Sequence, residues 1–276
     1  MNQVAEKVSN SADDTIVSVD GIAKRYEGGV QALKGVNLDI PAGQLTTFLG
    51  PSGCGKTTLL KIIAGLLDPT EGEVRIRGQK VTGPGPDRSF VFQDFALMPW
   101  ATVIRNVAFG LELSGASKEE RYEKATKYIA EVGLKGFEDA YPHELSGGMR
   151  QRVGLARALA VNADIILMDE PFASVDEQTR RKFQDDLLDL LAIEKKTVIF
   201  VTHSIEEAVY VSDQIVLLSR RPGKVANIFT TDLDRSVSPD EVRRQKNYLD
   251  SVDEIWAILR EYLQEDESAA ARKVRG

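Results

Sequence analysis

Short apolar runs of strand length alternate along the chain with glycine turns and with amphipathic stretches. The pattern predicts strands over residues 16–19, 36–40, 45–49, 73–77, 89–92, 164–168, 197–202 and 214–219. It predicts helices over residues 57–67, 117–132, 147–160, 179–192 and 205–211. After residue 164 the strands are continuous apolar runs separated by helices, and this pattern is typical of a mainly parallel sheet covered on both faces. The expected fold class is therefore α/β.

Polar composition and capping signals divide the chain into three parts. Residues 1–14 are polar and are expected to be a flexible N-terminus. Residues 15–235 are expected to form one α/β domain, with a helical subdomain at about 94–160. Residues 236–276 are expected to be a helical extension, because Ser238, Pro239 and Glu241 supply an N-cap, an N1 proline and an N3 glutamate. Apolar residues then recur at helical spacing as far as Leu263, so one face should pack on something.

Charge and cysteine content narrow the classes of function. The chain has 276 residues and a formal net charge of -7, so we expect no nucleic acid partner, because such binding depends on Lys and Arg contacts to phosphates. One cysteine, Cys54, excludes an internal disulfide and a cysteine-rich metal site. No apolar stretch approaches the ~20 residues of a spanning helix, and no signal peptide is evident. Any membrane role is therefore expected to be peripheral.

A glycine-rich segment after the 45–49 strand matches the phosphate-binding loop G-x-x-x-x-G-K-[ST]. Its glycines let backbone N–H groups turn toward a phosphate, and the following helix directs its positive end at the same anion. Lys56 can reach the β- and γ-phosphates, and Thr57 can ligate Mg²⁺. The alternative is a glycine turn with a helix cap. We predict a nucleoside triphosphate and Mg²⁺ as ligands, with nucleotide contacts from Gly50, Pro51, Ser52, Gly53, Cys54, Gly55, Lys56, Thr57 and Thr58.

Two adjacent carboxylates, Asp169 and Glu170, end the apolar run that begins at residue 165. Charges at the end of a buried strand are costly unless something compensates them. We expect Asp169 to act on the Mg²⁺ side and Glu170 to be the general base or water-orienting group for attack on the γ-phosphate. The alternative is a solvated strand end before the turn at Pro171.

The segment Leu145-Ser146-Gly147-Gly148-Met149-Arg150-Gln151 is similar to the ABC signature L-S-G-G-x-x-Q. On this segment the chain resembles the ATPase subunits of ABC transporters, with seven motifs in one order from about residue 16 to residue 224. The resemblance implies a P-loop cassette with a mainly parallel core sheet, an N-terminal antiparallel β subdomain and an inserted helical subdomain. It implies that Tyr26 stacks on adenine, that Gln93 is the Q-loop glutamine, a catalytic residue and a metal ligand, and that His203 contacts the γ-phosphate. Ser174-Val175-Asp176 matches the D-loop, although the family more often shows S-A-L-D.

The signature segment also predicts a second anion site, because Ser146 and the two glycines begin a helix with exposed N–H groups. In the family such a site covers the ATP that is bound to the partner subunit. The resemblance therefore implies nucleotide contacts from Ser146, Gly147, Gly148, Gln151 and Asp176. One loop and one signature per chain imply a head-to-tail homodimer with two-fold symmetry, closed by two ATP molecules and reopened by hydrolysis.

The segment 83–103, with its Pro99-Trp100 pair, resembles the ATPases of nitrate, sulfonate and taurine importers. This resemblance implies separate integral membrane permease subunits, an external solute-binding protein, a small anionic solute, and a peripheral location on the cytoplasmic face of the inner membrane. Phe95, Leu97, Met98 and Trp100 could form an apolar patch that holds a permease helix, or they could pack inside the helical subdomain. The functional alternatives are a soluble non-transport ABC ATPase and a nucleotide-sensing adaptor that binds without hydrolysis.

Overall fold

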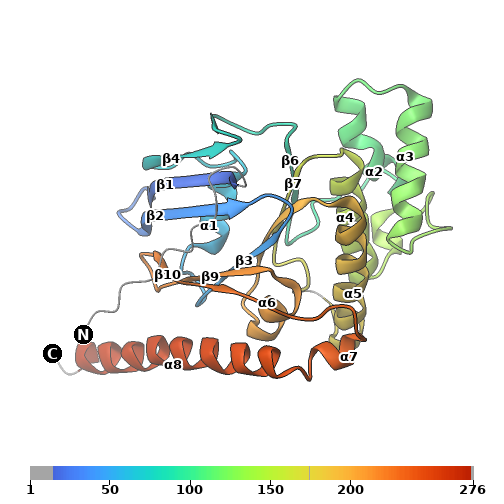
Figure 1. The fold of residues 1–276 in the computed structure, drawn as a ribbon. Helices are drawn as coiled ribbons and strands as arrows, with labels where there is room; N and C mark the ends of the chain where they lie inside the picture. Colours follow the sequence, from blue (N-terminus) through green and yellow to red (C-terminus); the bar gives the residue numbers. More distant parts are fainter. Residues whose placement is uncertain (1–14, 174, 275–276) are drawn as a thin grey trace.

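A computed structural model describes residues 15–173 and 175–274. The predicted flexible N-terminus and Ser174 therefore lie outside the described residues. Near its beginning the chain forms an antiparallel sheet with the strand order β2-β1-β4-β5 (Figure 1). Its strands are β1 (Thr15–Arg25), β2 (Gln31–Pro41), β4 (Glu71–Ile76) and β5 (Gln79–Lys80). This is the antiparallel subdomain that the family resemblance implied.

A second sheet, with the order β10-β9-β3-β8-β7-β6, forms the centre of the molecule. Its strands are β3 (Leu45–Leu49), β6 (Arg88–Val91), β7 (Ile165–Asp169), β8 (Thr197–Val201), β9 (Gln214–Leu218) and β10 (Val225–Thr230). All neighbours are parallel except β9 and β10. The α/β class with a mainly parallel sheet is confirmed. Strand β10 was not predicted, because it is a half-exposed edge strand without a continuous apolar run.

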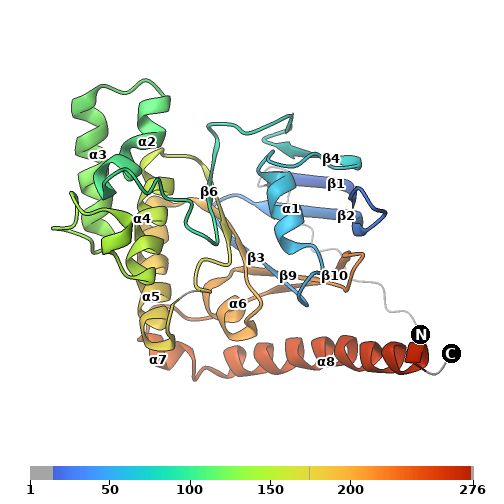
Figure 2. The same ribbon diagram turned by 180° about the vertical axis from the view of Figure 1, so that it is seen from behind.

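Helices cover both faces of the parallel sheet and form a separate lobe. They are α1 (Lys56–Ile63), α2 (Val103–Leu113), α3 (Lys118–Glu131), the 3₁₀ turn η1 (Pro142–Glu144), α4 (Gly147–Ala160), α5 (Glu177–Glu194), α6 (Ile205–Val211), α7 (Pro239–Val242) and α8 (Lys246–Val274). Figure 2 brings α1 to the front of the sheet, and α2 and α3 project to one side. The helix predicted over 57–67 ends early, because Gly65 has φ +73° and a Cβ there would lie 2.2 Å from the Gly83 carbonyl oxygen.

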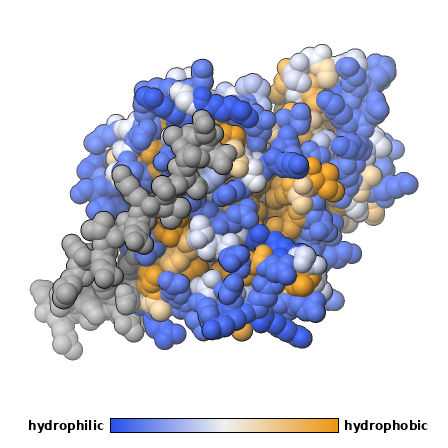
Figure 3. Space-filling model, viewed as in Figure 1, coloured by the Kyte–Doolittle hydropathy of each residue, from blue (hydrophilic) through white to orange (hydrophobic). Residues whose placement is uncertain are grey.

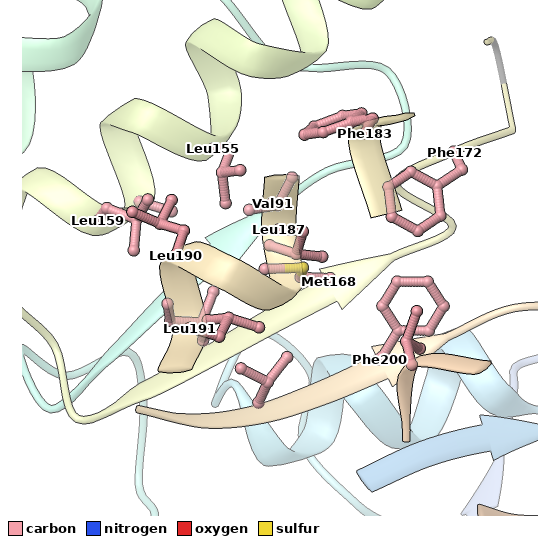
Figure 4. Packing of buried hydrophobic residues seen from close by; sticks show 14 of the residues in the cluster. Val91, Leu155, Leu159, Met168, Phe172, Phe183, Leu187, Leu190, Leu191 and Phe200 are labelled. Atoms are coloured by element: carbon pink, nitrogen blue, oxygen red, sulfur yellow. The ribbon is translucent and has the colours of Figure 1, made fainter. Parts of the chain in front are cut away.

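The parallel sheet separates two apolar clusters, and β7 shows the division. Ile165 and Leu167 belong to the cluster that contains α1, whereas Ile166 and Met168 belong to the cluster that contains α4 and α5. Successive side chains of a strand point to opposite faces, so a strand buried on both faces must be apolar throughout. Figure 4 shows Leu155 and Leu159 of α4 and Leu187 and Leu190 of α5 around this second face. Both clusters hold the carboxyl ends of β3, β7 and β8 in fixed register.

The C-terminal segment lies along the outside of the cassette. Where one helix was predicted, the structure has the short helix α7 followed by the long helix α8, which runs past α6 (Figure 1). Tyr248 and Ile255 of α8 are buried and Leu259 packs against the same cluster, so the predicted apolar face does pack on the domain. The predicted Leu263 belongs to the part of α8 whose side chains are not described. Figure 3 shows a mostly hydrophilic surface on this side, with smaller apolar areas, one of them beside the α2–α3 lobe.

Candidate functional site

The phosphate-binding loop connects β3 to α1 at the carboxyl edge of the parallel sheet. Gly50 must be glycine, because a Cβ there would lie 2.6 Å from the Leu218 carbonyl oxygen. Gly55, the N-cap of α1, has φ +108°, and its Cβ would lie 2.7 Å from Leu33 Cδ2. Two close approaches therefore fix the shape of the loop. The amino end of α1 and the loop amides face the same space, which is the arrangement that binds phosphate.

Lys56 is buried, and its ammonium group lies inside this loop. Nζ donates hydrogen bonds to the carbonyl oxygens of Gly50, at 2.7 Å, and of Pro51, at 3.2 Å. The cation is thus held where an oligophosphate would meet it. Cys54 is also buried, and this burial raises the pKa of its thiol, so the group is neutral at physiological pH. Cys54 therefore serves the loop through its backbone and its packing.

Two oxygen ligands suited to Mg²⁺ meet beside the loop. The Thr57 hydroxyl donates a hydrogen bond of 2.8 Å to Asp169 Oδ1. Asp169 is 5% exposed, and burial raises the pKa of its carboxyl, although the Thr57 hydrogen bond and the charge of Lys61 oppose this rise. A hydroxyl and a costly buried carboxylate form a hard oxygen donor set, which fits Mg²⁺. Gln93 is exposed two residues after β6, the strand that neighbours β7, and could complete the set from the same edge.

The raised pKa of Asp169 gives a prediction for Asp169→Asn. A carboxyl whose pKa is higher in the folded than in the unfolded state contributes most stability below its unfolded pKa, and this contribution is lost as pH rises through the folded pKa. The nucleotide-free variant should therefore be at least as stable as the wild type at pH 7, because it buries no charge. Its affinity for Mg²⁺-ATP should nevertheless fall by about tenfold to hundredfold. Urea denaturation from pH 4 to 8 and calorimetric titration check both statements, and a variant less stable at pH 7 with unchanged Mg²⁺-ATP affinity would contradict them.

Glu170 and His203 come together from adjacent strands. Glu170 follows β7 and His203 follows β8 by two residues, and Glu170 Oε2 lies 3.2 Å from His203 Nδ1. Glu170 has φ +47°, a left-handed conformation that costs energy for a residue with a side chain and that is often retained at functional sites. Its amide donates a hydrogen bond to the Val201 carbonyl oxygen, at 3.0 Å, which stabilises this turn. The strand ends thus direct a carboxylate and an imidazole into one space.

A cavity of about 400 Å³ brings Tyr26, the loop and Glu170 together. Tyr26 is half-exposed, and its hydroxyl lies 3.1 Å from Thr58 Oγ1, so its ring forms one wall. The same cavity is lined by Arg221, which the sequence analysis missed. A Cβ on Gly223 would lie 2.1 Å from the Cys54 carbonyl oxygen, so this segment returns to the back of the loop. No sequence signal indicates that return, because it depends on a tertiary contact between residues far apart in the chain.

The signature residues lie elsewhere, since neither Ser146 nor Asp176 is among the described residues that line this cavity. Ser146 is exposed, and its hydroxyl accepts the Met149 amide as the N-cap of α4. Asp176 accepts the Thr179 amide, at 3.0 Å, as the N-cap of α5, and this lowers the pKa of Asp176. A Cβ on Gly148 would lie 3.6 Å from Thr179 Cγ2, so both helix starts share one surface.

The structure does not favour the predicted nucleotide contact from Gln151. Its side chain is 1% exposed, so it is buried within the domain instead of facing outward with Ser146. The seventh position of the signature lies more than one turn into α4, on the side of the helix that packs against the domain. Gln151 therefore supports the helix that presents Ser146, Gly147 and Gly148.

Comparisons with known proteins show what the chain is similar to. A family model described as ABC transporter matches residues 33–173. An uncharacterized ABC transporter ATP-binding protein of Methanocaldococcus jannaschii is 55% identical over 79% of this chain and 83% of that protein. A nitrate import ATP-binding protein of Synechocystis is 43% identical over 88% of this chain and 94% of that protein. A taurine import ATP-binding protein of Pseudomonas syringae is 46% identical over 83% of this chain and 88% of that protein. A solved dimer of the ATP-binding cassette MJ0796, bound to ADP and Pi, is 37% identical, with a TM-score of 0.71 over 78% of this chain and 98% of that chain.

Proposed function

The chain belongs to the family of ABC transporter ATP-binding proteins, and on this premise we propose that it binds and hydrolyses ATP to power an importer. One observation carries the proposal. The phosphate loop, the Thr57–Asp169 pair and the Glu170–His203 pair all lie at the carboxyl ends of β3, β7 and β8. This is the edge where α/β sheets bind ligands, and the residues there supply a cation, a metal site and a base.

Each group has a part in hydrolysis. The loop amides and Lys56 bind the phosphates, and Tyr26 stacks on the adenine. Glu170 accepts a proton from the attacking water or orients it, and His203 holds the carboxylate and contacts the γ-phosphate. Thr57, Asp169 and Gln93 would hold Mg²⁺, and the ion would supply Lewis-acid stabilisation of negative charge at this site.

The surface with Ser146, Gly148 and Asp176 supports a head-to-tail homodimer. Its exposed helix start is an anion site away from the loop of the same chain, so it suits the triphosphate bound by a second copy. The MJ0796 cassette, which this chain resembles over most of its length, forms a dimer. Two ATP molecules would close the pair, and loss of the γ-phosphate would let it reopen.

The segment after β6 supports contact with permease subunits. Trp100 is 74% exposed, and Met98 is half-buried. Leu97 is partly buried against the domain core, so the predicted patch is divided: Leu97 packs on the core and Trp100 is available to a partner helix. No helix of the described residues is long and apolar enough to cross a membrane. We place the chain peripherally on the cytoplasmic face of the inner membrane, below permease subunits that receive solute from an external binding protein.

Relatives that import nitrate and taurine support a small anionic solute for the transporter. Residues that would contact a solute are not expected in this chain, because permease and binding protein select it. The cassette supplies the free energy of ATP hydrolysis, whichever solute the transporter carries. Identification of the solute therefore requires the ligand affinity of the external binding protein.

Trp100→Ala should separate ATP hydrolysis from binding to the permease. With the permease co-expressed and purified in detergent, we expect the variant to lose at least about tenfold in recovery with the membrane subunits, because an exposed aromatic often dominates such an interface. Turnover of the isolated chain should stay within twofold. Trp256→Ala, which removes a half-exposed tryptophan from α8, is the matched control. Equal recovery of both variants would contradict this docking surface, and an isolated wild type without Mg²⁺-dependent turnover would contradict hydrolysis.

A further inference from the structure

A connected set of polar contacts links the segment before α5 to the segment that carries His203. Arg180 of α5 donates a hydrogen bond from Nη2 to the Val175 carbonyl oxygen, at 2.9 Å. Its Nε lies 3.6 Å from Glu207 Oε1 on α6. The other carboxylate oxygen, Glu207 Oε2, accepts the Thr202 hydroxyl at 2.5 Å. Two segments that are far apart in the chain, residues 175–180 and 202–207, are therefore joined through the side chains of Arg180 and Glu207.

The Glu207 side chain does not make the contact that its position in the sequence predicts. Ser204 and Glu207 have the spacing of a capping box, in which the glutamate side chain returns to the N-cap amide. In the structure Ser204 does accept the Glu207 amide, at 3.2 Å, but the Glu207 carboxylate turns instead to Thr202 and Arg180. A carboxylate can leave a helix cap for a buried site only where that site supplies its own partners. The contacts with Arg180 and Thr202 are thus what hold this side chain in place.

Burial makes these contacts consequential. Glu207 is 9% exposed and Thr202 is 2% exposed. Burial raises the pKa of Glu207, while the Thr202 hydrogen bond and the charge of Arg180 lower it. Removal of one partner of a buried ion pair lowers the free energy of unfolding by more than the intact pair contributes to it, because the remaining charge is left without compensation. A displacement of Arg180 is therefore opposed by Glu207 and passed on to Thr202.

The contacts end at Thr202 and Ser204, the two residues that flank His203. Thr202 Oγ1 also accepts the Ser204 amide, at 3.1 Å, so the residues on both sides of His203 are fixed by one hydroxyl. A small cavity of about 50 Å³ is lined by Glu170, Arg180, His203 and Glu207 together. The position of His203 relative to Glu170 thus depends on the Glu207 carboxylate.

We propose that Glu207 and Arg180 are positioning residues that couple the segment at Val175 and Asp176 to His203. This inference rests on the proposed function, in which the Asp176 surface faces the second cassette. Closure of the pair then moves the 175–176 segment, and Arg180 and Glu207 transmit the movement to the loop that holds His203. Neither residue touches the nucleotide. Their effect is on the rate of hydrolysis, and ATP affinity is unchanged.

The test is a double-mutant cycle on the full-length protein with Glu207→Gln and Arg180→Gln. Glu207→Gln keeps an oxygen that can accept the Thr202 hydroxyl but removes the charge opposite Arg180. Each single variant should lower kcat by roughly tenfold to hundredfold, since small misplacements of catalytic groups have effects of this size. The ATP dissociation constant of the isolated chain should stay within twofold. The double variant should be no slower than the slower single variant, because both substitutions break the same connection.

Controls distinguish this coupling from loss of stability and from failure of the proposed function. Asp186→Asn breaks another arginine–carboxylate contact of α5, the 2.8 Å bond to Arg152, and should leave kcat within twofold. Melting temperatures identify misfolded variants. If Glu207→Gln does not fold, Arg180→Gln alone tests the coupling, because it should lower kcat and leave the ATP dissociation constant within twofold. Effects of the two substitutions that multiply, unchanged kcat, or equal losses in kcat and affinity would overturn the coupling alone. Absence of turnover in the wild type would overturn the proposed function and this inference with it.

Discussion

Glu170→Gln is expected to lower ATP turnover by about a hundredfold to ten-thousandfold while ATP binds as tightly as to the wild type. The glutamine amide has the same shape as the carboxylate but cannot accept a proton from water, and general-base catalysis contributes rate factors of this size. The loop, Lys56 and Tyr26 do not depend on the charge of Glu170. The variant therefore separates binding from chemistry, which is the distinction between an ATPase and an adaptor that senses nucleotide.

The measurement is single-turnover hydrolysis of ATP with Mg²⁺ in excess, together with equilibrium binding of ATP. Glu206→Gln is a matched control, because Glu206 is an exposed carboxylate close in sequence to the site, on α6. It should leave turnover within twofold. If Glu170→Gln hydrolysed ATP at more than a tenth of the wild-type rate, Glu170 would not be the base, and the left-handed backbone at this residue would need another explanation.

Local signals account for the parts of the molecule that the sequence predicted well. Strands β7 and β8 are buried on both faces, so each contains an uninterrupted run of four apolar residues that can be recognised without knowledge of its neighbours. The phosphate loop is recognisable for a similar reason, because its glycines and Lys56 meet local steric and chemical demands. Since Glu170 and His203 follow adjacent parallel strands, their meeting at one edge follows from topology once the sheet is known.

The parts that could not be predicted depend on contacts between distant segments. Arg221 reaches the nucleotide cavity because Gly223 packs against the Cys54 carbonyl, 169 positions earlier in the chain (223 minus 54). Glu207 satisfies the spacing of a capping box, and local reasoning therefore assigns it to the helix start and not to Arg180. In each case the local sequence is compatible with one set of contacts, and tertiary packing selects a different set.

Dimer closure should be visible in the Glu170→Gln background, where ATP is retained. With saturating Mg²⁺-ATP we expect a dimer, and without nucleotide a monomer. Adding Ser146→Asp should abolish the dimer, because it places a carboxylate at the helix start that would receive the partner's triphosphate. Aspartate is as good an N-cap as serine, so α4 itself keeps its cap. We expect the dimer dissociation constant to rise at least about a hundredfold, which corresponds to about 2.7 kcal/mol.

Ser117→Asp supplies a matched control for this last experiment. Ser117 is the N-cap of α3 and accepts the Glu120 amide at 3.2 Å, the same contact that Ser146 makes with Met149. Because α3 belongs to the outer lobe, a charge at its start should leave the ATP-dependent dimer intact. Sedimentation or light scattering measures the mass. A Glu170→Gln protein that stays monomeric with saturating Mg²⁺-ATP, even when bound to its permease, would contradict the closed pair, and equal dimerisation of both aspartate variants would remove Ser146 from the interface.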